Sequence, residues 1–184
     1  MLRHVELYEA LKKRRDALPT ELLKYYQFTQ RIVDIRLSDK HEHLRITDAP
    51  NGGLHLKVQK INKDGLLTKE LLDRTYDPSL TKEVRVYLSN GNDSVSINAP
   101  NSRIKLRIIG GNNSKKYHLQ QTNKRTTLYD KGEQSRFYEE KPTTRRYFSQ
   151  DSTHTAFVPV NLYNVWAPKV AVGYNLDDGI LLGA

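Results

Sequence analysis

Apolar residues near the start of the chain recur at the spacing of one helix face. This spacing holds as far as Leu18, and Pro19 is expected to end the helix because proline lacks a backbone N–H. Thr20 is expected to cap a second helix that carries Leu22, Tyr25 and Tyr26 on one side. The pattern predicts a helical pair within residues 1–33.

From Ile32 onward the apolar spacing changes from 3.6 residues to two. Alternating apolar and polar residues predict half-buried strands around Val33, Leu44 and Leu54. Turn-forming residues lie between them, and residues 66–76 are interpreted as a returning strand rather than a helix. The pattern indicates an antiparallel meander.

Two later segments are similar to each other. Residues 84–88 lead into Asn90-Gly91-Asn92-Asp93, and residues 104–108 lead into Gly110-Gly111-Asn112-Asn113, about twenty residues further on. Such spacing is typical of stacked β-rungs, although two copies fall short of the roughly three repeats that a self-sufficient solenoid needs.

These patterns predict an α+β fold that is mainly antiparallel β. A helical segment at 1–33 precedes an antiparallel β domain at 34–119, built as a β-meander or a short β-roll-like sheet. Residues 120–159 are rich in Lys, Arg, Thr, Gln and Glu and predict a basic irregular connector. A C-terminal hairpin is expected within 160–184.

The pattern of that hairpin suits a membrane strand. Ala171 and Gly173 alternate with larger residues before a turn at 176–179, and a transmembrane β-strand needs about 9–11 such residues. A soluble hairpin with one buried face has the same alternation. The residues expected to face lipid are Trp166, Val170, Val172 and Tyr174.

Charge is concentrated in one part of the chain. The 184 residues carry a net charge of +9 and no cysteine, which excludes disulfides and thiolate chemistry. Residues 101–149 hold 12 Lys/Arg against 4 Asp/Glu. The period of two places Arg103, Lys105 and Arg107 toward solvent and Ile104, Leu106 and Ile108 toward the core.

The basic face has two interpretations, a solvated sheet surface or a surface for a phosphate-bearing partner such as lipopolysaccharide. Nucleic acid is the weaker choice, because no aromatic platform is interleaved with the basic residues.

Candidate chemistry is sparse. Gly91-Asn92-Asp93 matches half of a calcium-binding β-roll repeat, but Lys115 stands where the second copy needs an aspartate. One carboxylate cannot supply six to eight oxygen ligands, so a plain turn is favoured over calcium at Asp93. His41 and His43 could form a metal pair but lack a third ligand at a recognisable spacing. We find no catalytic constellation and expect no enzyme activity from this chain.

Several segments resemble a family of large bacterial outer-membrane proteins. In that family a calcineurin-like metallophosphoesterase domain, when present, precedes a connector region and a surface-antigen β-barrel. The resemblance covers nearly the whole chain. The segments that carry it are 10–19, Lys24-Tyr25-Tyr26, 74–78, 82–87 with Gly91-Asn92-Asp93, 108–111, and 167–179 with its Gly-Tyr-Asn-Leu-Asp-Asp-Gly.

The resemblance implies a non-catalytic connector that links an upstream exported domain to a barrel whose first strands lie in 160–184. The location implied is the outer membrane or periplasm of a Gram-negative bacterium, although the sequence has no signal peptide. No phosphoesterase ligand set is present, because Asp93 stands where the family's G-N-H motif needs histidine. The alternative is a soluble calcium- or polyanion-binding β-module.

Overall fold

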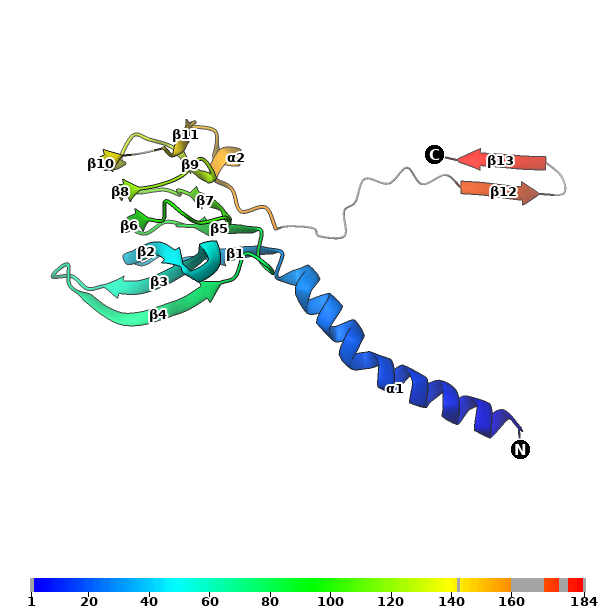
Figure 1. The fold of residues 1–184 in the computed structure, drawn as a ribbon. Helices are drawn as coiled ribbons and strands as arrows, with labels where there is room; N and C mark the ends of the chain where they lie inside the picture. The colour runs from blue at the N-terminus through cyan, green and yellow to red at the C-terminus, as the bar shows by residue number, and fades with distance from the viewer. Residues whose placement is uncertain (1, 142, 160–170, 176–178, 184) are drawn as a thin grey trace.

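Two sheets lie face to face in the computed structural model and bury their apolar sides between them (Figure 1). The structure describes residues 2–141, 143–159, 171–175 and 179–183. The five-stranded sheet is parallel throughout, in the order β1 (Ile32–Arg36), β5 (Glu83–Tyr87), β7 (Lys105–Ile109), β9 (Thr126–Asp130) and β11 (Arg145–Phe148). The six-stranded sheet has the order β10 (Arg136–Lys141), β8 (Lys115–Gln121), β6 (Asp93–Asn98), β2 (Glu42–Ala49), β3 (Gly53–Ile61) and β4 (Leu67–Tyr76).

The chain passes back and forth between the two sheets and so builds a β-solenoid. Its rungs are β1–β2, β5–β6, β7–β8 and β9–β10, and within each sheet the strands of successive rungs are parallel. The register pairs Glu83 with Lys105 and Asp93 with Lys115, so equivalent residues of the second and third rungs are 22 apart. The repeat seen in the sequence is therefore a stack of rungs.

The predicted antiparallel β domain is correct only in part. Strands are found where the sequence predicts them, including β4, and β2, β3 and β4 do form an antiparallel meander. The rungs themselves pair in parallel, so the fold is α+β with mixed sheets. A period of two determines which residues are buried, but not which strand becomes the neighbour.

Residues 120–159 are not irregular as predicted. They contain β9, β10, β11 and the short helix α2 (Ser152–Thr155). The interior positions of β9 include Thr126 and Asp130, which are 2% exposed. These buried polar residues break the apolar alternation on which the prediction depended.

The core is a continuous apolar column between the sheets. Its members come from every rung, and the largest contribution is from β-branched and leucine side chains that suit the pleated surface. Fully buried members include Leu44, Ile46, Leu56, Val84, Val86, Val95, Ile97, Ile108, Leu119 and Leu128.

Glycines let the turns of successive rungs stack closely. A Cβ at Gly91 would overlap the carbonyl oxygen of Lys40, and one at Gly111 would overlap that of Ser89. Lys40 and Ser89 occupy the equivalent turn of the rung below, so any larger residue would push the rungs apart.

The predicted helical pair is wrong: α1 (Leu2–Thr29) is one helix with Pro19 inside it. Strong helix formers flank the proline on both sides, so the helix continues beyond the missing hydrogen bond. The helix extends away from the sheets (Figure 1), and its apolar side chains, including Leu11, Leu22 and Tyr25, are exposed. Within the described residues, no helix combines the length and apolar character needed to cross a membrane.

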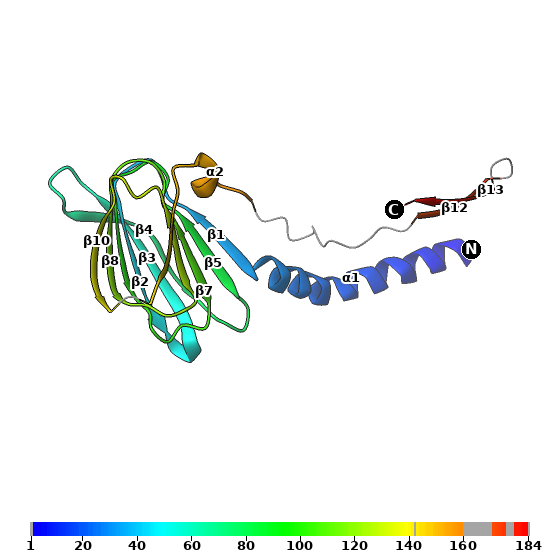
Figure 2. The ribbon, with the colours of Figure 1, turned by 90° about the horizontal axis from the view of Figure 1, so that it is seen from above.

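After β11 the chain turns back over the outer face of the five-stranded sheet, and we call residues 149–159 the strap. Phe157 packs edge-on against Tyr87 with ring centres 4.9 Å apart, and the Arg36 guanidinium lies 4.4 Å from the Phe157 ring centre. Figure 2 shows α1 and the strap on the same side of the solenoid, that of the five-stranded sheet. The outer face of the six-stranded sheet carries neither.

The predicted C-terminal hairpin is present. Strands β12 (Ala171–Asn175) and β13 (Gly179–Gly183) pair antiparallel, with Val172 opposite Leu182 and Tyr174 opposite Ile180. Trp166 and Val170, two of the four residues expected to face lipid, lie outside the described residues. Lipid contact by this hairpin stays a prediction.

Candidate functional site

A buried ion pair occupies the turn where the sequence suggested calcium. The Lys115 ammonium and the Asp93 carboxylate are both fully buried, with Nζ 2.8 Å from Oδ2. Lys115 Nζ also donates to the carbonyl oxygens of Ser89, at 3.2 Å, and of Gly91. The other Asp93 oxygen accepts the backbone N–H of Glu42 at 3.1 Å.

The ammonium of Lys115 therefore takes the place that a bound cation would have among these oxygens. Burial raises the pKa of Asp93 to about 6, while the nearby Lys115 ammonium acts in the opposite direction. A calcium ion at Asp93 would first have to displace Lys115.

His41 and His43 do not form a metal pair in the structure. His41 Nδ1 accepts the backbone N–H of Asn92 at 3.0 Å, which ties the first rung's turn to the next. His43 lies in β2 with its side chain on the outer face. Among the described residues there is no group of three or more His, Cys, Asp or Glu that could hold a metal ion.

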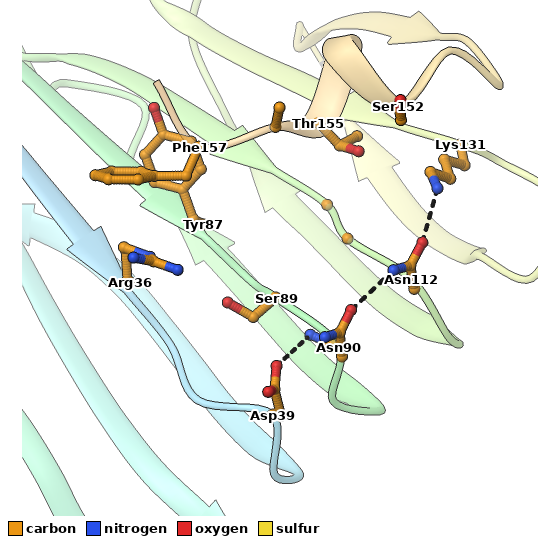
Figure 3. Close-up of a pocket in the computed structure, with 13 residues that line it drawn as sticks. Arg36, Asp39, Tyr87, Ser89, Asn90, Asn112, Lys131, Ser152, Thr155 and Phe157 are labelled. Atoms are coloured by element: carbon orange, nitrogen blue, oxygen red, sulfur yellow. Dashed lines mark hydrogen bonds between the residues drawn. The ribbon is translucent and has the colours of Figure 1, made fainter. Parts of the chain in front are cut away.

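A cavity of about 330 Å³ lies beside the stacked turns, and we call it the turn cavity (Figure 3). Four side chains from successive rungs form a line along it. The Asn90 backbone N–H donates to Asp39 at 3.3 Å, the Asn112 amide donates to Asn90 at 2.8 Å, and Lys131 donates to Asn112 at 2.7 Å. These groups bond mainly to one another, so the line acts as a ladder that holds the turns together.

A second buried polar cluster lies at the turn between β9 and β10. The Tyr117 hydroxyl donates to Asp130, which also accepts the Gly132 N–H and the Ser135 hydroxyl, both at 2.7 Å. Burial and the Asp130 charge raise the pKa of Tyr117 well above its usual range. A Cβ at Gly110 would overlap the Asp130 carboxylate, so this glycine makes room for the cluster.

The three basic residues predicted to face a polyanion do not share one open surface. The burial alternation is confirmed, because Ile104, Leu106 and Ile108 are at most 1% exposed. Lys105 Nζ and Arg107 Nε, however, lie 3.6 and 2.8 Å from the Glu83 carboxylate. Arg103 lies apart in the turn before β7, where its N–H donates to Gly52 at 2.8 Å.

Glu83 also pairs with Arg85, whose Nε is 2.6 Å away. One carboxylate with an 11% exposed side chain therefore holds three cations on the outer face of the five-stranded sheet. Three of the 12 Lys/Arg residues in 101–149 are held in these pairs: Lys105 and Arg107 on this face, and Lys115 in the interior.

A cavity of about 630 Å³ lies on the outer face of the six-stranded sheet, and sequence analysis missed it. We call it the sheet trough. Its residues come from rungs far apart in sequence, and only an alignment of the 22-residue repeats would have brought them together. The polar side chains that line its floor and walls are His41, His43, Arg45, Asn92, Ser94, Ser114, Lys116 and His118.

The sheet trough is the arrangement best suited to bind a ligand, because its basic groups are not used by the fold. Among the residues whose side chains the structure describes, no carboxylate forms an ion pair with Arg45 or Lys116. The one carboxylate that borders the trough, Asp93, is paired with Lys115 in the interior. The charge and the hydrogen-bond donors of its lining suit an anion better than a cation.

Comparison with known proteins gives no further guide to the site. No family model, curated protein or solved structure matches the chain.

Proposed function

We propose that the chain is the non-catalytic connector region of an outer-membrane protein. It links an upstream exported domain to a surface-antigen-type β-barrel that begins with the C-terminal hairpin. In the family that the chain resembles, a metallophosphoesterase domain, when present, has this upstream position. The observation that supports this best is the path of the chain. The strap returns over the five-stranded sheet, so α1 and the strap lie on the same side of the solenoid (Figure 2).

In this proposal the two segments that flank the solenoid, α1 and the C-terminal hairpin, contact other parts of a larger protein. Helix α1 exposes Leu7, Leu11, Leu18 and Leu22 by more than half of their surface, which is unusual for a helix that has no further partner. Strands β12 and β13 pair antiparallel, as adjacent barrel strands do, and their described lengths of five residues are about half of the 9–11 that a membrane strand needs. In this proposal the buried ion pairs and polar ladders serve the fold rather than catalysis.

Cell fractionation with an antibody to the solenoid tests the connector. The expected result is a band far larger than the 21.3 kDa of this chain, in the outer-membrane fraction. A band of 21.3 kDa confined to the soluble fraction would contradict the proposal. Phosphoesterase activity that co-purifies with the large band would identify the upstream domain.

A second candidate is a soluble polyanion-binding β-module. It is favoured by one observation: on the outer face of the six-stranded sheet, no carboxylate with a described side chain forms an ion pair with Arg45 or Lys116. The proposed partners are phosphate groups such as those of lipopolysaccharide. A calcium-binding module is the weaker form of this candidate, because Lys115 already fills the oxygen cage at Asp93.

A further inference from the structure

The register of the six-stranded sheet aligns two columns of side chains on its outer face. One column runs through His43, Ser94, Lys116 and Arg136, and the next through Arg45, Ser96, His118 and Tyr138. Residues between them in sequence, such as Leu44, Val95 and Tyr117, are fully buried. The two columns therefore face away from the core.

A short side chain in the middle strand makes room for the hollow. Ser94 lies in β6, between the longer side chains of β2 on one side and β8 on the other. Neighbouring strands are about 4.8 Å apart, so a group centred over β6 lies between Arg45 and Lys116. The Ser94 hydroxyl lies on the floor on which it would rest.

Two further sides of the trough are formed by apolar residues and by a stacked imidazole ring. Ile61 and Leu67 form an apolar rim at the β3–β4 hairpin. The His118 ring stacks on Tyr138, with ring centres 4.7 Å apart and 8° between the planes. This stacking holds one imidazole edge toward the hollow, and the volume of about 630 Å³ is in the range of small-molecule sites.

We propose that the sheet trough binds a phosphoryl group carried on a less polar body, such as a phosphorylated sugar unit. Arg45 and Lys116 supply positive charge, and Ser94 and Ser114 supply hydroxyl donors. His43 adds charge when it is protonated. The inference rests on the second candidate function and is independent of the connector.

The surroundings of His43 make binding dependent on pH. Burial, Arg45 and His118 lower the pKa of His43, and His41 and Lys116 also border the trough. On the β3 side, Gln59 is opposite His43, and the ammonium of Lys57 is paired with Glu70 and Asp73. A phosphoryl anion in the trough would favour imidazolium, so binding of one charge state of the phosphate should tighten as the pH falls toward the pKa of His43.

Nuclear magnetic resonance titration of the full chain with inorganic phosphate, and separately with glucose 6-phosphate, tests the proposal. Both should shift the amides of β2, β6 and β8, and the sugar phosphate should bind more tightly because it also meets the apolar rim. Arg45→Gln and Lys116→Gln should each weaken binding about tenfold or more. Lys105→Gln is the matched control, since it removes the same charge from the opposite sheet.

A second variant separates shape from charge. Ser94→Val fills the floor of the hollow, keeps every basic residue and suits a strand. It should abolish phosphate binding while the thermal midpoint is kept. Vesicles with and without phosphatidic acid show whether a lipid headgroup can supply the phosphoryl group in place of a soluble phosphate.

Three results would overturn the inference. The first is an equal loss of phosphate affinity in Lys105→Gln and Lys116→Gln. The second is unchanged phosphate affinity in the serine-to-valine variant, and the third is no binding of any phosphate probe by the natural chain. Salt-sensitive binding of heparin that survives in the valine variant would leave the general polyanion function standing and remove only the phosphoryl site.

Discussion

The two outer faces of the solenoid carry similar basic residues but differ in what surrounds them. On the five-stranded sheet, Glu83 holds Arg85, Lys105 and Arg107, and the strap lies across part of the face. On the six-stranded sheet, Arg45 and Lys116 border a hollow with Ser94 on its floor. The three named cations of the first face share one carboxylate, whereas no described carboxylate forms an ion pair with Arg45 or Lys116.

This difference shows that the number of basic residues in a segment does not measure its free charge. Of the basic residues in 101–149, Lys115 is fully buried and paired, and Lys105 and Arg107 share one carboxylate. Whether a cation is free depends on residues that are 22 or more positions away in sequence. The account can be tested by breaking the pairs and by filling the hollow.

The largest effect is expected from Lys115→Met. It leaves the buried Asp93 carboxylate without its counter-charge, and loss of one partner of a buried pair costs about 3–5 kcal/mol of unfolding free energy. Urea denaturation measures this. Lys105→Met, which breaks a pair whose lysine is 43% exposed, should cost less than about 1 kcal/mol. Equal costs for the two variants would contradict the distinction between interior and surface pairs.

A smaller loss is expected from Gly111→Ala. The new Cβ would overlap the Ser89 carbonyl oxygen of the rung below, and such overpacking costs about 1–3 kcal/mol. Gly65→Ala is the control, because a Cβ there meets nothing and only its φ of +79° opposes the change. The midpoint of thermal denaturation should be lower for Gly111→Ala than for Gly65→Ala. The reverse order would argue against close stacking of the turns.

Glu83→Gln should leave the basic residues of the five-stranded face without their shared carboxylate, as on the six-stranded face. It releases Arg85, Lys105 and Arg107 from their shared carboxylate, with a stability loss of about 1–2 kcal/mol. Heparin affinity should rise, and salt should weaken the binding more steeply. Unchanged heparin affinity would mean that the pairs with Glu83 do not limit the free charge of this face.

The smallest effect is expected from deletion of residues 1–27. Phe28, which is half-buried, is kept with Gln30 and Arg31, which bond to Arg74 and Lys82, and residues 3–27 of α1 are exposed. The unfolding free energy of the solenoid should change by less than about 0.5 kcal/mol. Phosphate binding should also be unchanged. A loss of several kcal/mol would show that α1 stabilises the sheets.

The strands were predictable from sequence, but their pairing was not. Apolar alternation around Val33, Leu44 and Leu54 identifies β1, β2 and β3 directly. However, β1 pairs with β5, which begins 51 residues after it, and alternation contains no information on such distant partners. The Gly/Asn turns at Gly91 and Gly111 were the local signal for the solenoid, because their stacking requires glycine.

The site was less predictable than the fold. Lys115 was interpreted as a residue that spoils a calcium repeat, whereas its ammonium fills the oxygen cage at Asp93. The sheet trough depends on His43, Ser94 and Lys116, which become neighbours only through the register of three parallel strands. Nothing within one rung marks these residues as a site.

The pKa of His43 also predicts how stability changes with pH. In the folded chain this pKa lies below its usual 6.5, so the unfolded chain binds more protons when the pH falls below 6.5. The His43 contribution to stability is therefore full above pH 6.5 and is lost as the pH falls toward the folded pKa. Asp93, with a pKa raised to about 6, changes stability with pH in the opposite sense. The His43 contribution is therefore measured as the difference in unfolding free energy between the natural chain and His43→Gln at each pH.

The most direct test of the free anion site is the pKa of His43 itself, followed by nuclear magnetic resonance of its imidazole with and without inorganic phosphate. The account predicts a pKa below 6.5 in the free chain, which rises when phosphate is added. In Arg45→Gln with Lys116→Gln, loss of the Arg45 charge raises the starting pKa, and added phosphate should change it little. A His43 pKa that does not respond to saturating phosphate would contradict the claim that the six-stranded face holds an open anion site.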